Sequence, residues 1–291
     1  MKIVYYTSGI TGSGRVITGI AIANAFKRKS IQCDYSIIHS SDFEFFSNEI
    51  KFFKIPVENE EILLKKDYHI SSLYKILEKI KPDVILFDLI WFMTCNFIHE
   101  LNCKKILLCR QVSDKYFSIP LPDQKLVFNP DHFDLIFATE PFKSTVEMRQ
   151  LNPLIIRNRD EIFTRDKALK KLGIKNKRSV CLLAYNGEPG EYEAIKKKYS
   201  YLTDTEYQML YSTNYSDKSY FPIVDYFNAF DFIVSGAGYN AFWEIIYFNK
   251  EAIFEPVPRQ FEDQFWRVQN CQEYYFDENG ADQLVDIIMN L

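Results

Sequence analysis

The stretch Asp231-Phe-Ile-Val-Ser-Gly-Ala-Gly-Tyr-Asn-Ala-Phe-Trp-Glu244 decides how the second half of this chain is interpreted. Its apolar residues 232–234 predict a buried strand, the small residues 235–238 a tight turn, and the residues up to 248 a helix. A strand that enters a helix through glycines aims free backbone N–H groups and the positive end of the helix at one point. The pattern therefore predicts a site for a phosphate group.

Glu244 lies six residues after Gly238, about one and a half turns into the predicted helix at roughly 3.6 residues per turn. A carboxylate at that place cannot help to bind phosphate, but it can accept both hydroxyls of a ribose, as acids do in dinucleotide folds. The alternative is a turn whose small residues serve packing only, with Glu244 exposed to solvent. The segment by itself leaves both interpretations open.

A second polar stretch, Glu255-Pro-Val-Pro-Arg-Gln-Phe-Glu-Asp-Gln264, follows the next predicted strand at residues 252–254. Its prolines end the strand, and acids and amides then open the next helix. Carboxylates and amides are the side chains that hydrogen-bond sugar hydroxyls. Ordinary N-capping by Glu262 or Asp263 is the alternative, and for this stretch taken alone it is favoured.

The first half follows the same plan. Residues 3–6 predict a buried strand, residues 9–14 a glycine-rich turn, and residues 16–28 a helix that ends in cations, which suit a helix C-terminus. Further strands are predicted at residues 34–38, 84–87, 105–109, 135–138 and 180–184, and a helix at 165–178. Asn152-Pro153 disfavours helix and predicts a boundary. The chain is therefore expected to form two α/β domains, residues 1–152 and 153–291.

Composition limits the classes of function. The chain has 291 residues, 47% of them hydrophobic and 25% charged, as in a soluble globular protein. A net charge of −4 gives no global field that favours nucleic acid, so no nucleic-acid partner is expected. Six scattered cysteines are expected to be reduced thiols, and no signal peptide or membrane span of roughly 18 apolar residues is found. We expect a cytoplasmic protein, and a peripheral membrane contact is left open.

Residues 238–244 and 258–264 together resemble the donor-site signature of GT-B glycosyltransferases, G-x-N-[ST]-x-x-E followed by P-x-x-x-[ED]-Q. The closest resemblance in pattern is to the peptidoglycan N-acetylglucosaminyltransferase and similar family 28 and family 1 enzymes. In the first half, residues 2–28 resemble the strand, G-x-G-H-x-x-R turn and helix of that family, and residues 81–88 its K-P-D strand. The resemblance implies two Rossmann-like domains whose parallel sheets face a central cleft.

The resemblance also implies roles for single residues. Glu244 would hold the donor ribose, and Glu262, Asp263 and Gln264 the transferred sugar. Glycine turns and the start of the second-half helix would bind the donor diphosphate, and the residues implied there are Gly12, Gly14, Arg15, Asn186, Gly187, Ser235, Gly236, Gly238, Tyr239 and Asn240. No metal and no cofactor are expected, because the helix dipole replaces the cation and the nucleotide sugar is a substrate.

Two departures from the family pattern concern the first glycine turn. Arg15 stands where the family usually has His, and Thr18 where it often has Arg. That His is the family's general base for the acceptor hydroxyl, and Arg cannot replace it because a guanidinium stays protonated. Another group is then the base, or the acceptor needs none, or activity is lost. Asp88 and Asp114, which follow predicted strands, are the candidate catalytic bases.

The predicted function is the metal-independent transfer of a hexosyl group from a nucleotide diphosphate sugar, expected to be UDP-linked, to a hydroxyl acceptor. The acceptor class, whether glycan, lipid or small molecule, is not indicated by the sequence. Two alternatives bind the same donor. One is a nucleotide-sugar epimerase on the same fold, and the other is a non-catalytic nucleotide-sugar-binding protein, which the missing His favours.

Overall fold

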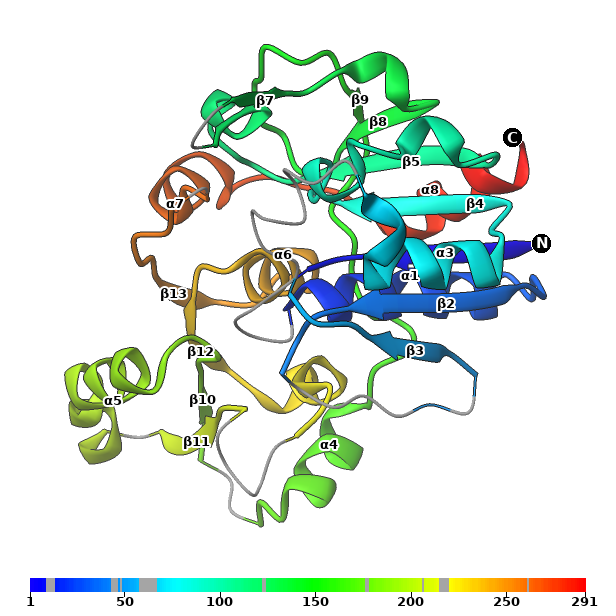
Figure 1. Ribbon diagram of the computed structural model, residues 1–291. Coiled ribbons are helices and arrows are strands. Elements are labelled where there is room, and N and C mark those ends of the chain that lie inside the picture. The colour runs from blue at the N-terminus through cyan, green and yellow to red at the C-terminus, as the bar shows by residue number, and fades with distance from the viewer. Residues whose placement is uncertain are drawn as a thin grey trace. The chain divides into compact units, whose positions relative to one another are not determined.

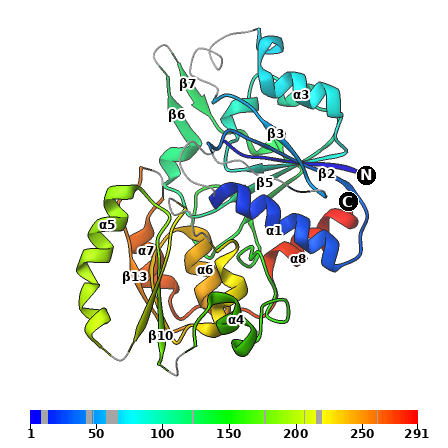
Figure 2. The same ribbon diagram turned by 90° about the horizontal axis from the view of Figure 1, so that it is seen from below.

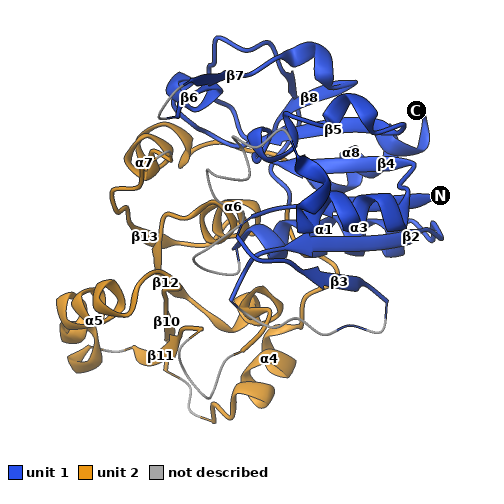
Figure 3. Ribbon diagram, viewed as in Figure 1, with its two compact units in different colours: residues 1–154, 278–291 blue, residues 155–277 orange. Residues whose placement is uncertain are grey.

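The computed structural model describes residues 1–8, 14–42, 47, 49–57, 67–121, 124–175, 178–205, 207–214, 220–260 and 262–291. The chain forms two compact units, residues 1–154 with 278–291, and residues 155–277 (Figure 3). Each unit contains its own parallel sheet (Figure 1). The predicted boundary at residue 152 lies close to the end of the first segment, whereas residues 278–291, predicted for the second domain, belong to the first unit.

The first unit is built on a seven-stranded sheet with the order β3-β2-β1-β4-β5-β8-β9. All neighbouring strands in it run parallel. The strands are β1 Lys2–Tyr6, β2 Asp34–His39, β3 Lys51–Lys54, β4 Val84–Asp88, β5 Lys104–Cys109, β8 Leu135–Ala138 and β9 Arg149–Gln150. The central strands are almost wholly buried, which explains why they are continuous apolar runs in the sequence rather than alternating ones.

The α-helices that the structure describes in this unit are α1 Gly14–Arg28, α3 Ser72–Ile80 and α8 Gly280–Met289. The C-terminal helix α8 lies beside α1 (Figure 2), and Arg28 pairs with Asp282 at 2.7 Å. A Cβ on Gly280 would overlap the backbone of Asn152, so the start of α8 requires glycine. The structure also describes shorter elements in this unit: η1 Tyr68–Ile70, η2 Phe92–Thr94, η3 Ile98–Glu100, η4 Asp114–Phe117, η5 Pro130–His132, and the antiparallel pair β6 Ser118–Pro120 and β7 Lys125–Val127.

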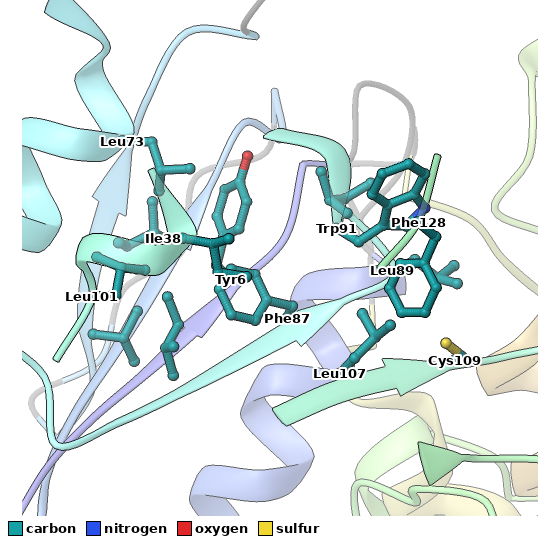
Figure 4. Close-up of a cluster of buried hydrophobic side chains, with 14 of the residues drawn as sticks. Tyr6, Ile38, Leu73, Phe87, Leu89, Trp91, Leu101, Leu107, Cys109 and Phe128 are labelled. Carbon is teal, nitrogen blue, oxygen red and sulfur yellow. The ribbon is translucent and has the colours of Figure 1, made fainter. Parts of the chain in front are cut away.

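One face of the first sheet is covered by a large apolar cluster (Figure 4). Tyr6 and Phe87, on the neighbouring strands β1 and β4, meet edge to face with ring centroids 6.3 Å apart. Trp91 and Phe128 pack in the same cluster at 5.4 Å. The cluster includes Leu89, directly after β4, and Cys109, the last residue of β5. Asp88 and Arg110, described below, are their neighbours in the sequence.

The second unit has a four-stranded parallel sheet with the order β11-β10-β12-β13. Its strands are β10 Val180–Ala184, β11 Gln208–Ser212, β12 Phe232–Gly236 and β13 Ala252–Glu255. Its helices are α4 Arg165–Leu172, α5 Pro189–Lys198, α6 Tyr239–Tyr247 and α7 Gln264–Cys271, with the short η6 Ser200–Asp204 and η7 Ile223–Ala229. Helix α4 ends before the predicted residue 178, because Gly173 adopts a positive φ of 71° and caps it.

Candidate functional site

The turn between β12 and α6 has the geometry of an anion site. Gly238 is the N-cap of α6 and offers no side chain to the helix, and the first turn of α6 contains no acid. A Cβ on Gly238 would meet no atom of the described residues within 4 Å, so those residues leave room beside the turn. The positive end of the α6 dipole lies at this turn, and such a helix N-terminus favours an anion.

The other helices of the second unit begin differently. Helix α4 has Asp166 in its first turn, and α5 begins with a capping box formed by Glu188 and Glu191. At α7 the side chain of Asp263 accepts a hydrogen bond from the Trp266 N–H at 2.8 Å. Of the α-helices that the structure describes in this unit, α6 is the one whose N-terminus carries no carboxylate. An anion is accordingly favoured at α6.

The ring of Tyr185 explains two of the glycines predicted for the diphosphate site. A Cβ on Gly236 would approach this ring to 2.8 Å, and one on Gly187 to 2.5 Å. Both residues must therefore be small for packing, whatever else they do. The ring of Tyr185 thus lies beside both the loop after β10 and the turn after β12, and a role of these glycines on a diphosphate stays a prediction. Asn186, which is exposed, accepts a hydrogen bond from the Asn214 N–H at 2.9 Å.

A polar chain extends from Tyr185 to the polar stretch after β13. The Tyr185 hydroxyl donates to Glu191 at 2.7 Å, and Arg259 donates to both oxygens of Glu191 at 2.8 Å. These bonds, with Arg259 the main cause, lower the pKa of Glu191 to about 2. Glu191 therefore stays ionised at neutral pH and ties residue 259 to helix α5.

Glu244 is buried, with only 9% of its surface exposed, so the alternative that it is a solvent-exposed side chain is wrong. Burial raises the pKa of Glu244 to about 8, an effect that Arg157 opposes and Asp225 reinforces. Arg157 and Asp225 pair with each other at 2.9 Å. Within the described residues the structure shows no hydrogen bond to the Glu244 carboxyl group. Because these residues form no hydrogen bond with it, the Glu244 carboxyl group can still donate or accept hydrogen bonds with a ligand.

Three residues predicted to hold the transferred sugar make contacts within the protein. Glu262 pairs with Arg267, and Asp263 is the N-cap of α7. Gln264 is buried, and its Oε1 accepts a hydrogen bond from the Val257 N–H at 3.1 Å. These contacts fix the loop before α7. For Asp263, N-capping is the alternative that the sequence favoured. A role on the sugar stays a prediction for all three.

In the first unit, Asp88 ends β4 in a buried position. Its carboxylate accepts two hydrogen bonds of 2.8 Å from Arg110 Nη2, and Oδ2 lies 2.7 Å from the Tyr5 hydroxyl. That hydroxyl is also 2.8 Å from the carbonyl oxygen of Arg15. With its side chain only 2% exposed, Asp88 has the environment of a structural ion pair rather than of a base that takes up a substrate proton.

The remaining first-unit candidates are placed as follows. Gly12 lies outside the described residues, and Gly14 is the exposed first residue of α1. Arg15 is half-buried, and its Nη1 donates to the Ser8 carbonyl at 3.2 Å. Asp114 is exposed, and its Oδ1 accepts from the Thr145 N–H at 3.1 Å and the Ser144 hydroxyl at 3.0 Å. These bonds, the backbone one foremost, lower the pKa of Asp114.

Comparison with solved structures identifies the architecture. SpnP, a spinosyn forosaminyltransferase, superposes with a TM-score of 0.61 at 8% identity over 99% of this chain and 90% of its own. MurG of Acinetobacter baumannii gives 0.52 at 12% identity over 100% and 91%. UGT2 of Phytolacca americana, in complex with UDP-2fluoro-glucose and pterostilbene, gives 0.53 at 13% over 100% and 89%. These neighbours are GT-B proteins.

The chain has the GT-B fold. The predicted fold class, α/β with a parallel sheet in each half, is confirmed. No protein-family model and no curated protein sequence matches the chain. At these low identities the likeness extends to the fold, and the assignment of function depends on the site residues.

Three residues that shape these sites were not predicted from the sequence. Arg110 directly follows β5, which pairs in parallel with β4. The predicted strands 84–87 and 105–109 therefore already indicated that Arg110 lies near Asp88, at the carboxyl ends of two parallel strands. Tyr185 follows β10 in the same way. Arg267 has no such signal, because a single cation within a polar helix is indistinguishable from a solvated one. Only the packing of α7 shows that it is fully buried.

Proposed function

We propose that the protein is a glycosyltransferase that moves a hexosyl group from a nucleotide diphosphate sugar to a hydroxyl acceptor. The observation that carries this proposal is the acid-free start of α6, which opens at Gly238. The buried Glu244 on the same helix supports it by offering a carboxyl group for the ribose. Among proteins with a similar fold, SsfS6 of Streptomyces sp. SF2575 is known in complex with thymidine diphosphate, and UGT2 with a UDP sugar.

In the proposed reaction the acceptor oxygen attacks the anomeric carbon, and the bond from that carbon to the diphosphate oxygen breaks. Negative charge grows on the leaving diphosphate. Backbone N–H groups and the dipole at the start of α6 stabilise this charge, because they are already oriented before the reaction. The proton of the acceptor hydroxyl must go to a base, and Arg15 cannot take it since its guanidinium stays protonated.

We predict that UDP binds without a divalent cation, because α6 supplies the positive potential that a metal would otherwise give. In the described part of the chain no group of three His, Cys, Asp or Glu side chains is placed to hold a metal ion. Calorimetry with UDP, with and without a chelator, tests the prediction. Equal dissociation constants are expected, and loss of binding in the chelator would show that a cation is needed.

We predict that Asp114→Asn lowers the turnover of the transfer reaction about 10²–10⁴-fold, as the loss of a general base does. Asp114 is the exposed candidate, whereas Asp88 is enclosed by Tyr5 and Arg110. The Asn side chain keeps Oδ1, so the bonds from Thr145 and Ser144 persist. Release of UDP is the readout, with UDP affinity as the control. An unchanged rate would mean that Asp114 is not the base.

A nucleotide-sugar-binding protein without turnover is the second candidate function. It is favoured by Arg15, which occupies the position of the family's base. Binding of a UDP sugar with no release of UDP in the presence of many acceptors would support it. An epimerase would instead convert the sugar of the donor with no acceptor present.

A membrane-spanning helix is not found in the part of the chain that the structure describes.

A further inference from the structure

We propose that Arg267 is a positioning residue for the diphosphate subsite, and that Glu262 offsets its charge. The inference rests on the proposed function, because it concerns how the turn before α6 is held and charged. In this account Arg267 fixes the direction of the first N–H donor of the turn and adds a positive charge behind it. Glu262 then tunes anion affinity rather than contacting the sugar.

Arg267 is fully buried on α7, with 0% of its surface exposed. Arginine is almost never buried to this degree unless its charge is paired. Its Nη1 donates to the carbonyl of Ala237 at 2.8 Å and pairs with Glu262. Its guanidinium carbon lies 5.8 Å from the centroid of the Tyr239 ring. One side chain thus contacts the turn, the first residue of α6, and the polar stretch before α7.

The bond to Ala237 determines which way the turn presents its amide. In a trans peptide unit the carbonyl and the next N–H point in opposite directions. Since the Ala237 oxygen points to Arg267, the Gly238 N–H points away from it. A Cβ on Gly238 would meet none of the described residues within 4 Å. Arg267 therefore holds this donor in a fixed direction, and rotation of the peptide would cost the buried hydrogen bond.

The charge of Arg267 also acts on the turn. A charge in the protein interior is screened less than one at the surface, so it attracts an anion at the turn over a distance of several ångströms. Glu262, whose side chain is 24% exposed, opposes this attraction. Buried ion pairs contribute little net stability. The pair is explained better by its effect on the turn than by stabilisation of the fold.

The test compares UDP with uridine, because uridine lacks the diphosphate. Dissociation constants are measured by calorimetry for UDP and by ligand-observed NMR for uridine, on the full chain. Arg267→Met keeps the unbranched side chain as far as the position of Nε but removes the guanidinium with its charge and hydrogen bonds. It is expected to weaken UDP binding roughly tenfold or more. Uridine affinity is expected to stay within about twofold, since the nucleoside does not reach the turn. Arg267→Lys keeps the charge, and its UDP affinity is expected to lie between those of the unmodified protein and Arg267→Met.

Glu262→Gln is the matched variant, for which the opposite change in UDP affinity is expected. It keeps the shape beside Arg267 and removes the opposing charge, so UDP affinity is expected to rise a few-fold while uridine affinity is unchanged. If Arg267→Met does not fold, Glu262→Gln alone tests whether the charge of Arg267 affects UDP affinity. Unchanged or weaker UDP binding by Glu262→Gln would overturn the inference, as would equal losses of UDP and uridine by a folded Arg267 variant. Failure of the unmodified protein to bind UDP at all would instead overturn the proposed function.

Discussion

Arg110→Ala is expected to lower the free energy of unfolding by about 3–5 kcal/mol, the usual cost of removing one partner of a buried ion pair. Arg110 and Asp88 are 10% and 2% exposed and lie 2.8 Å apart. Without Arg110, the Tyr5 hydroxyl would be the one hydrogen-bond partner left to the buried Asp88 carboxylate among the described residues. Urea denaturation at pH 7 measures the difference in the free energy of unfolding.

The control for this variant is Lys104→Ala, at the other end of β5. Lys104 pairs with Asp134 at 3.0 Å on the surface, and loss of such a pair costs about 0–1 kcal/mol. The double variant Asp88→Leu with Arg110→Met removes both charges and is expected to recover most of the loss. If Arg110→Ala were no more destabilising than Lys104→Ala, the buried Asp88 carboxylate would not depend on Arg110 as its partner.

Glu244→Gln is expected to change how stability depends on pH. Burial raises the pKa of Glu244 from 4.5 to about 8, so the folded protein keeps a proton that the unfolded chain releases. The stability associated with this proton is complete below about pH 4.5 and is lost as the pH rises through 8. The slope is about 1.4 kcal/mol per pH unit, or on the order of 4 kcal/mol between pH 5 and 8. Glutamine cannot ionise, so this contribution disappears in the variant.

Urea denaturation of both proteins at pH 5, 6, 7 and 8 checks this expectation. The free energy of unfolding of Glu244→Gln, relative to that of the unmodified protein, should increase steadily as the pH rises. Glu251→Gln removes an exposed carboxylate from the same unit and controls for the change in net charge. Parallel stability curves for the unmodified protein and Glu244→Gln would show that Glu244 ionises normally, in an environment less apolar than the structure indicates.

Edge strands mark the limit of what local sequence patterns predict. The predicted strands at 84–87, 135–138 and 180–184 agree with β4, β8 and β10 to within a residue, because each is a continuous apolar run. Strands β3 and β11 were not predicted. Both lie at sheet edges and are half-exposed, and both begin and end in polar residues, Lys51 and Lys54 in β3 and Gln208 and Ser212 in β11. They exist because a neighbouring strand offers them backbone hydrogen bonds, which is a property of the fold rather than of the segment.

The sequence by itself determined the alternation of strands and helices, the α/β class, and the turn from Gly236 to Gly238 at the start of α6. These features depend on neighbours within a few positions along the chain, where periodicity and glycine act directly. The tertiary structure alone decided that Asp88 is enclosed by Arg110, that Glu244 is buried, and that residues 278–291 return to the first unit. Such properties arise where distant segments pack together, and burial then changes the chemistry of a carboxyl group that the sequence only names.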